Sequence, residues 1–129
     1  MVENFVIIIM ENKLDYLKAQ IMTMMDLVRT QVTKAHKAFM HIDKDLAREV
    51  LHYENRVNAL ELSIDGDCEH LFERSRLRGV ELRFALSSLK VNTQLERIGD
   101  HADMMGRIVL LLENKYDAAL LEEIGRAHV

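Results

Sequence analysis

The chain has no proline and no tryptophan, and glycine occupies only five of its 129 positions. Proline and glycine most often end helices and form tight turns, so their scarcity excludes folds with many loops and favours a few long helices. The single cysteine, Cys68, excludes an internal disulfide and is typical of a reducing compartment. We expect Cys68 to pack as a small hydrophobic side chain.

Charge and hydropathy exclude further classes of protein. Acidic and basic residues are interspersed and give a net charge of −4 at pH 7, so no basic surface is indicated and nucleic acid is not an expected partner. The longest apolar run, Phe5 to Met10, is far shorter than the roughly 18 residues that span a membrane. The sequence therefore predicts a soluble, cytoplasmic chain without a membrane span.

Apolar side chains recur every three or four residues along three stretches, which predicts three long helices. We call these rows of apolar side chains seams. The first runs from Leu14 to Phe39 and includes Val32, the second runs from Leu46 to Leu71, and the third runs from Val91 to Leu112 and includes Ile98. Short connections force long helices to run antiparallel, so we predict an all-α, up-down-up three-helix bundle. We treat residues 1–129 as one domain with a core of about 13–113.

Capping residues indicate where these helices end. Asn12 is a candidate N-cap of the first helix, which we expect to end near His41. Asp43 is a candidate N-cap of the second helix, which we expect to reach about Arg76, with Gly79 as its C-cap glycine. The third helix is predicted to begin directly after this glycine.

Two further expectations concern Gly66 and the C-terminus. Gly66 interrupts the second seam, and we expect a bend or a close helix approach there. Residues 114–129 are predicted to form a short helix, over about 116–124, or a frayed tail.

Three acids stand on one face of the third predicted helix. Glu96, Asp100 and Asp103 are spaced i, i+4 and i+7, so a helix places them in one row. Like charges at this spacing repel, and the row therefore requires either open water or a bound cation.

The second predicted helix carries a matching polar stripe. Its members, spaced by four, three and four residues, are Glu54, Asn58, Glu61 and Asp65. In an antiparallel pair of helices the two stripes can face each other, and such oxygen-rich groups suit hard or borderline cations. The other interpretation is a solvated charged face with nearby arginines and lysines as counter-ions. The residues alone leave both interpretations open.

An enzyme is not predicted. Ferritin-type di-iron proteins need two Glu-x-x-His motifs on a four-helix bundle, whereas this chain has one, Glu49 to His52, on too few helices. No arrangement of Ser, His and Asp or of Cys and His indicates a nucleophile. We therefore predict no catalytic residues and no organic cofactor.

The stretch Leu95 to Ala102, which reads LERIGDHA, resembles the signature of the PhoU family of phosphate-signalling regulators. Supporting resemblances lie at Glu81 to Arg83, at Asp43 to Ala47 and from Leu51 to Glu61, and the resemblance covers roughly Lys13 to Glu113. It implies a regulatory domain that acts with a sensor histidine kinase and the phosphate transporter, in the cytoplasm or at the inner face of the membrane. Family members usually contain two such three-helix repeats, and similar single repeats form the cytoplasmic tail of some sodium–phosphate cotransporters.

The resemblance also implies a site for iron or another divalent or trivalent metal. Carried over to this sequence, the third-helix motif falls on Glu96 and Asp100, and the second-helix motif falls on Glu54 and Asn58. Asn58 replaces an expected aspartate, as does Gln94, so the site has less charge than the family pattern. Glu61 and Asp103 are further candidate ligands.

A single repeat is expected to form a homodimer, which restores the six-helix arrangement and buries the remaining apolar positions. Three interpretations of function stay open: a regulatory adaptor of phosphate uptake, the cytoplasmic domain of a sodium–phosphate cotransporter, and a metal-free helical dimerisation module.

Overall fold

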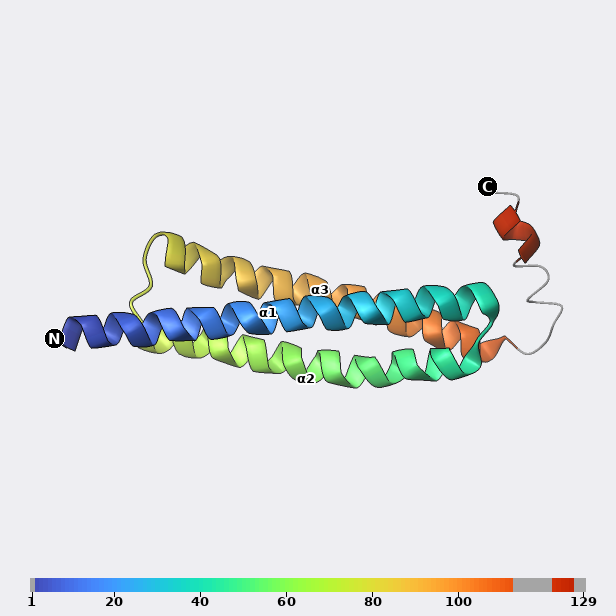
Figure 1. Ribbon diagram of the computed structural model, residues 1–129, viewed down its shortest axis with the longest axis horizontal. Coiled ribbons are helices and arrows are strands. Elements are labelled where there is room, and N and C mark those ends of the chain that lie inside the picture. The colour runs from blue at the N-terminus through green and yellow to red at the C-terminus, as the bar shows by residue number, and fades with distance from the viewer. Residues whose placement is uncertain (1, 113–121, 127–129) are drawn as a thin grey trace.

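The structure, a computed structural model, describes residues 2–112 and 122–126, except for the side chains of residues 6, 7 and 9–11. Three long helices follow one another: α1 (Val2–His41), α2 (Lys44–Arg74) and α3 (Val80–Leu111). They run up, down and up, and each packs against the other two along an elongated bundle (Figure 1). The all-α, up-down-up bundle predicted from the sequence is confirmed.

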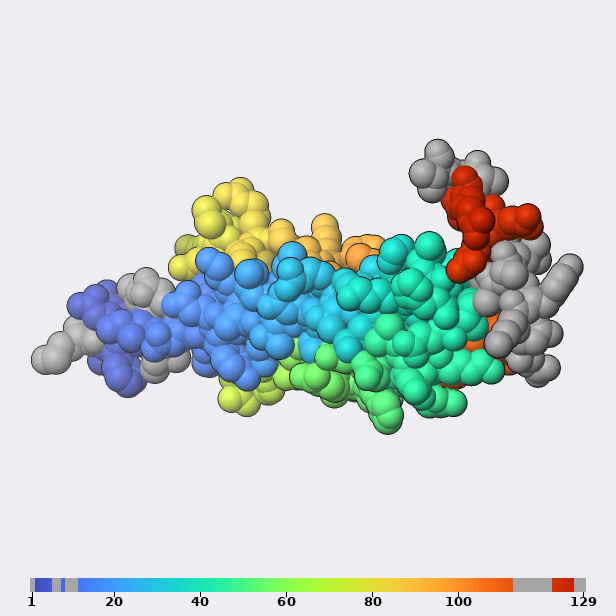
Figure 2. Space-filling model, turned by 45° about the vertical axis from the view of Figure 1, so that its right-hand side comes forward, coloured from blue at the N-terminus to red at the C-terminus, as the bar shows by residue number. Residues whose placement is uncertain are grey.

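The helix ends differ from the prediction in two places. α1 begins at Val2, so Asn12 lies inside the helix and is not its N-cap. Neither proline nor glycine interrupts residues 2–12, and the helix therefore continues through the apolar run; its N-terminal turns extend beyond the other two helices (Figure 2). α2 ends at Arg74 rather than at about Arg76.

At the C-terminus, residues 122–126 are helical, which agrees with a short helix after the bundle. The remainder of that predicted segment, 114–121 and 127–129, lies outside the described residues. None of the helices described here has the length and apolar character needed to cross a membrane.

The two turns depend on different residues. Asp43 is the N-cap of α2, as predicted, and its side chain accepts a 3.0 Å hydrogen bond from the backbone N–H of Leu46. Gly79 was expected to end α2, but it is instead the residue before α3 and has φ +58°. Glycine tolerates this left-handed conformation, which allows the chain to turn directly into α3.

The apolar seams are displaced by one residue in two helices. In α1, Gln31 is fully buried whereas the expected seam residue Val32 is 43% exposed. In α3, Asn92 is fully buried whereas Val91 and Ile98 are 40% and 45% exposed. The predicted seams are wrong at these positions, and the bundle encloses two amides.

A layer of polar side chains lies inside the core, with apolar clusters on either side of it. The larger apolar cluster lies toward the α2–α3 turn and includes Leu17, Met24, Ile64 and the free thiol of Cys68. Toward the other end the core consists of smaller apolar clusters, one of which contains Ala35. The polar layer between them contains the candidate functional site.

The glycines inside the helices have unequal surroundings. We expected a bend or a close helix approach at Gly66; a Cβ atom there would meet nothing within 4 Å, so the close approach is wrong. At Gly106 a Cβ atom would lie 3.2 Å from the carbonyl oxygen of Ala47. α2 and α3 therefore approach closely at Gly106 and at Gly99, which belongs to the site.

Candidate metal site between α2 and α3

Three carboxyl groups meet between α2 and α3. Glu54 comes from α2, and Glu96 and Asp100 come from successive turns of α3; one oxygen from each lies within 4.8 Å of the others. Glu54 is buried, Glu96 is half-buried and Asp100 is exposed, so the group opens toward solvent on its α3 side. We call these three residues the carboxylate group.

Gly99 brings α3 close enough for this group to form. A Cβ atom at this position would lie 2.9 Å from Oε1 of Gln31, 3.3 Å from Cγ1 of Val57 and 3.4 Å from Oε2 of Glu54. These separations are at or below van der Waals contact, so a larger residue would have to displace the Gln31 side chain or push α3 away. The glycine between Glu96 and Asp100 therefore sets the distance from these acids to α2.

A glutamine from α1 completes the buried side of the site. Nε2 of Gln31 donates a 2.7 Å hydrogen bond to Oε2 of Glu54 and lies 3.5 Å from the carbonyl oxygen of Val50. Sequence analysis missed Gln31, although one signal was available: it stands three residues after Val28 and four before Ala35, which are both seam positions. A polar residue at a seam position indicates a buried polar contact.

Burial and mutual repulsion favour protonation of the two glutamates. Burial raises the pKa of Glu54 to about 7, hydrogen bonding to Asp100 adds to this effect, and the bond from Gln31 opposes it. Burial, followed by hydrogen bonding to Asp100 and its charge, likewise raises the pKa of Glu96 to about 7. The carboxylate group therefore holds protons near neutral pH, and a bound cation would displace them.

Two buried oxygens of the site accept no hydrogen bond from any residue that the structure describes: Oε1 of Glu54 and Oε1 of Gln31. An unpaired buried oxygen costs about 1–3 kcal/mol. Oxygen atoms of this kind are ligands of hard cations, so the donor set fits a metal ion.

The other predicted ligands are placed less favourably. Asn58 is exposed, and its amide brings no charge. Glu61 is half-buried, and burial, together with the charges of Asp65 and Asp100, raises its pKa. Oδ2 of Asp103 accepts a 2.8 Å hydrogen bond from Nε of Arg107 on its own helix, whereas its Oδ1 is buried without a partner among the described residues.

Asn92 connects the same two helices further along the bundle. Its Nδ2 atom donates to the carbonyl oxygen of Glu61 (3.1 Å) and to Oδ1 of Asp65 (3.0 Å). Asn92 thereby links α3 to the backbone and to an acidic side chain of α2.

The geometry defines a three-helix bundle with an acidic site between its second and third helices. The PhoU domain family matches residues 21–109, which include the whole of α2, most of α3, the second half of α1 and the whole site. The chain belongs to the PhoU family.

Several relatives carry the name of phosphate-specific transport system accessory protein PhoU. The protein of Edwardsiella tarda is 37% identical over 98 residues, which cover 76% of this chain and 40% of the relative. The homolog of a Burkholderia species is 39% identical over 85 residues (66% of this chain, 36% of the relative). The protein of Escherichia coli strain K12 is 32% identical over 117 residues (88% and 48%). This chain thus spans less than half the length of these relatives, and no solved structure matches it significantly.

Proposed function

We propose that this chain is a regulatory adaptor of phosphate transport and phosphate-starvation signalling, without enzymatic activity, and that it binds a metal ion at the carboxylate group. Membership of the PhoU family and the names of the relatives, which are accessory proteins of a phosphate-specific transport system, support the regulatory role. The meeting of Glu54, Glu96 and Asp100 within 4.8 Å is the observation that supports the metal site.

The chemistry of the site favours a hard or borderline cation such as iron. Glu54, Glu96 and Asp100 would hold the ion, which would replace the protons now favoured by burial and repulsion. The buried side chain of Gln31 orients Glu54 through Oε2 and leaves Oε1 free of other partners among the described residues.

The donor set favours a single ion over a multinuclear cluster. Two positions with aspartate in the family pattern are amides here, and both of them, Asn58 and Gln94, are exposed. Amide oxygens contribute no charge, so fewer positive charges can be balanced.

As partners we propose a sensor histidine kinase, components of the phosphate transporter, and a second copy of the chain. These interactions would place the protein in the cytoplasm, at the inner face of the membrane. The contact in a homodimer would be formed by exposed apolar side chains on the outer side of α3: Leu86, Met104, Ile108 and Leu111. A monomeric mass at micromolar concentration would count against the dimer.

Elemental analysis of the untagged protein, purified without chelator, tests the metal site. The variant is Asp100→Asn, and the matched control is Asp26→Asn, an aspartate that is 73% exposed on α1. We expect stoichiometric metal in the wild type and the control and none in Asp100→Asn. Added metal should raise the stability of the first two proteins only, by about 2.7 kcal/mol at a hundred times Kd.

The contrary result is also specific. If no sample contains or responds to metal, and Asp100→Asn is as stable as the wild type or more so, the carboxylate group is a solvated acidic face. The chain would then act as a metal-free helical docking or dimerisation module.

A further inference from the structure

α1 and α3 run side by side in the same direction, and both carry exposed apolar side chains (Figure 1). Met25 and Val32 of α1 are 47% and 43% exposed, and Val91 and Ile98 of α3 are 40% and 45% exposed. The members of each pair are seven residues apart, close to two helical turns, so each pair forms a row along its helix.

The two rows lie on adjoining flanks of α1 and α3. On α3, Glu96 faces α2, and Ile98 lies about 200° further round the helix, on the flank beside α1. On α1, Lys34 faces α2 through its 2.7 Å ion pair with Glu49. Val32 lies about 200° from Lys34, on the flank beside α3.

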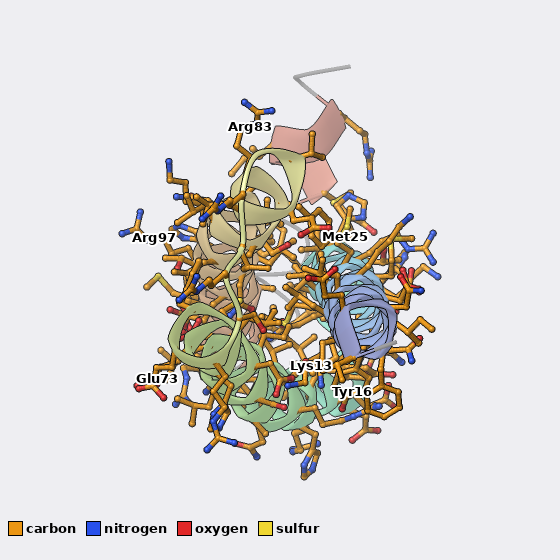
Figure 3. All side chains as sticks on the ribbon, turned by 90° about the vertical axis from the view of Figure 1, so that its left-hand side faces the viewer. Lys13, Tyr16, Met25, Glu73, Arg83 and Arg97 are labelled. Atoms are coloured by element: carbon orange, nitrogen blue, oxygen red, sulfur yellow. The ribbon has the colours of Figure 1, made fainter. Side chains whose placement is uncertain are left out.

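The rows are also level along the bundle. Oε1 of Gln31 lies 2.9 Å from the Cβ position of Gly99, so the neighbouring side chains Val32 and Ile98 lie at the same height. The same correspondence holds seven residues earlier, and Figure 3 shows Met25 on the side of α1 that is turned toward α3. The four apolar side chains therefore form one surface, which we call the α1/α3 patch.

Exposed basic side chains flank this patch on both helices: Arg83, Lys90 and Arg97 of α3, and Lys18 and Arg29 of α1. Those of α3 recur every seven residues, and Figure 3 shows Arg83 and Arg97 projecting from the outer side of the helix. Arg29 lies 3.4 Å from Asp26, a largely exposed contact that offsets one of these charges. The rim of the patch is therefore basic, although the whole chain is acidic.

We propose that the α1/α3 patch binds an amphipathic helix of a partner protein, with acidic residues on both sides of its apolar stripe. Apolar rows at helical spacing are the contacts used by helices that dock along a surface, and charge complementarity selects the partner and its orientation. From Arg83 to Arg97 the basic row extends about 21 Å, so a helix of about 18 residues covers it. The proposal does not depend on metal binding.

A second copy of this chain fits the patch poorly. In a symmetric dimer the same surface meets itself, so the basic rims would be brought together. The partner must instead supply negative charge beside its apolar side chains.

Two synthetic helical peptides of about 18 residues test the proposal against the full chain. Both carry leucines at positions i, i+3, i+4 and i+7; one has glutamates beside this stripe and the other has lysines. We expect the glutamate peptide to bind, with affinity that falls as salt is raised, and the lysine peptide to bind at least about tenfold more weakly.

Variants of exposed residues assign the binding to the patch. Ile98→Ser and the double variant Arg83→Glu/Lys90→Glu should each lower the affinity for the glutamate peptide by about tenfold. The double variant should also raise the affinity for the lysine peptide. The controls are Leu62→Ser, 71% exposed on α2, and Lys37→Glu, exposed on α1; both should bind like the wild type. Unchanged thermal unfolding shows that each variant is folded.

Three outcomes would overturn the proposal. The first is equal affinity for both peptides or no binding to either. The second is a dimer in sedimentation that Ile98→Ser dissociates, because the occupant would then be a second copy. The third is that the wild type binds phosphatidylglycerol vesicles but neither peptide, and that Ile98→Ser and the double variant lose vesicle binding. The patch would then be a membrane contact.

Discussion

Nε2 of Gln31 on α1 lies 2.7 Å from Oε2 of Glu54 on α2, and this hydrogen bond joins the first helix to the acids shared by the other two. The bond favours the ionised form of Glu54 and opposes the effect of burial on its pKa. α1 therefore takes part in the chemistry of a site whose carboxyl groups all come from α2 and α3.

Replacing this glutamine tests that role. Gln31→Leu keeps a similar volume but removes the donor, so the ionised carboxylate of Glu54 loses a partner at a cost of about 1–3 kcal/mol. We expect the loss, measured by urea unfolding of metal-free protein, to be larger at about pH 8 than at about pH 5, where Glu54 is protonated. Gln94→Leu, on the exposed side of α3, is the control. An equal effect at both pH values would contradict the assignment.

The glycines give a matched pair of substitutions. Gly99→Ala places a methyl group 2.9 Å from Oε1 of Gln31, and we expect a loss of stability of about 1–3 kcal/mol despite the better helix propensity of alanine. Gly66→Ala meets nothing within 4 Å and should gain up to about 1 kcal/mol. Thermal unfolding of both variants measures the difference. A gain in both would mean that α3 is not held against Gln31.

Stability of the metal-free protein should depend on pH through the carboxylate group. Burial, with the help of Asp100, raises the pKa of Glu54 and of Glu96 from 4.5 to about 7, so the native state binds more protons than the unfolded state between these values. The associated stability is complete below about pH 4.5 and is lost as the pH rises through about 7.

Asp100→Asn should reduce this slope, because the neighbouring negative charge is removed. The measurement is the free energy of unfolding in urea at several pH values, with Asp26→Asn as the control. Identical slopes in the wild type and Asp100→Asn would show that Asp100 does not influence the two glutamates.

Cys68 should be chemically inert in the folded protein. Its side chain is fully buried in the larger apolar cluster, and burial, followed by the charges of Asp65 and Asp67, raises the pKa of the thiol to about 11. Because the thiolate is the reactive form, we expect a thiol reagent to label Cys68 only after unfolding in denaturant. Rapid labelling under native conditions would indicate that this end of the core opens readily.

The acids of the site were predictable, because i, i+4 spacing and antiparallel helices together place them opposite one another. The seam spacing fits Gln31 and its neighbour Val32 equally well, and only the packing of α1 against α3 decides which of the two faces the core. That packing depends on the contact at Gly99, which joins residues far apart in the chain.

The same displacement explains the errors in α3. Sequence periodicity assigned Val91 and Ile98 to the core, but Asn92 beside them is the buried residue, and its Nδ2 atom donates to two acceptors on α2. A hydropathy pattern does not take hydrogen bonds between helices into account. The valine and isoleucine that were thereby left outside form half of the α1/α3 patch.

Acidic and basic side chains lie on different sides of α3. Acids gather on the flank of α3 that meets α2, whereas Arg83 and Arg97 project from its outer side (Figure 3), and Lys90 stands midway between them in the sequence. The acidic and basic side chains of α3 are therefore separated across the long axis of the bundle. A charged partner would rotate it about that axis before contact, so that one side arrives first, and salt would weaken this steering.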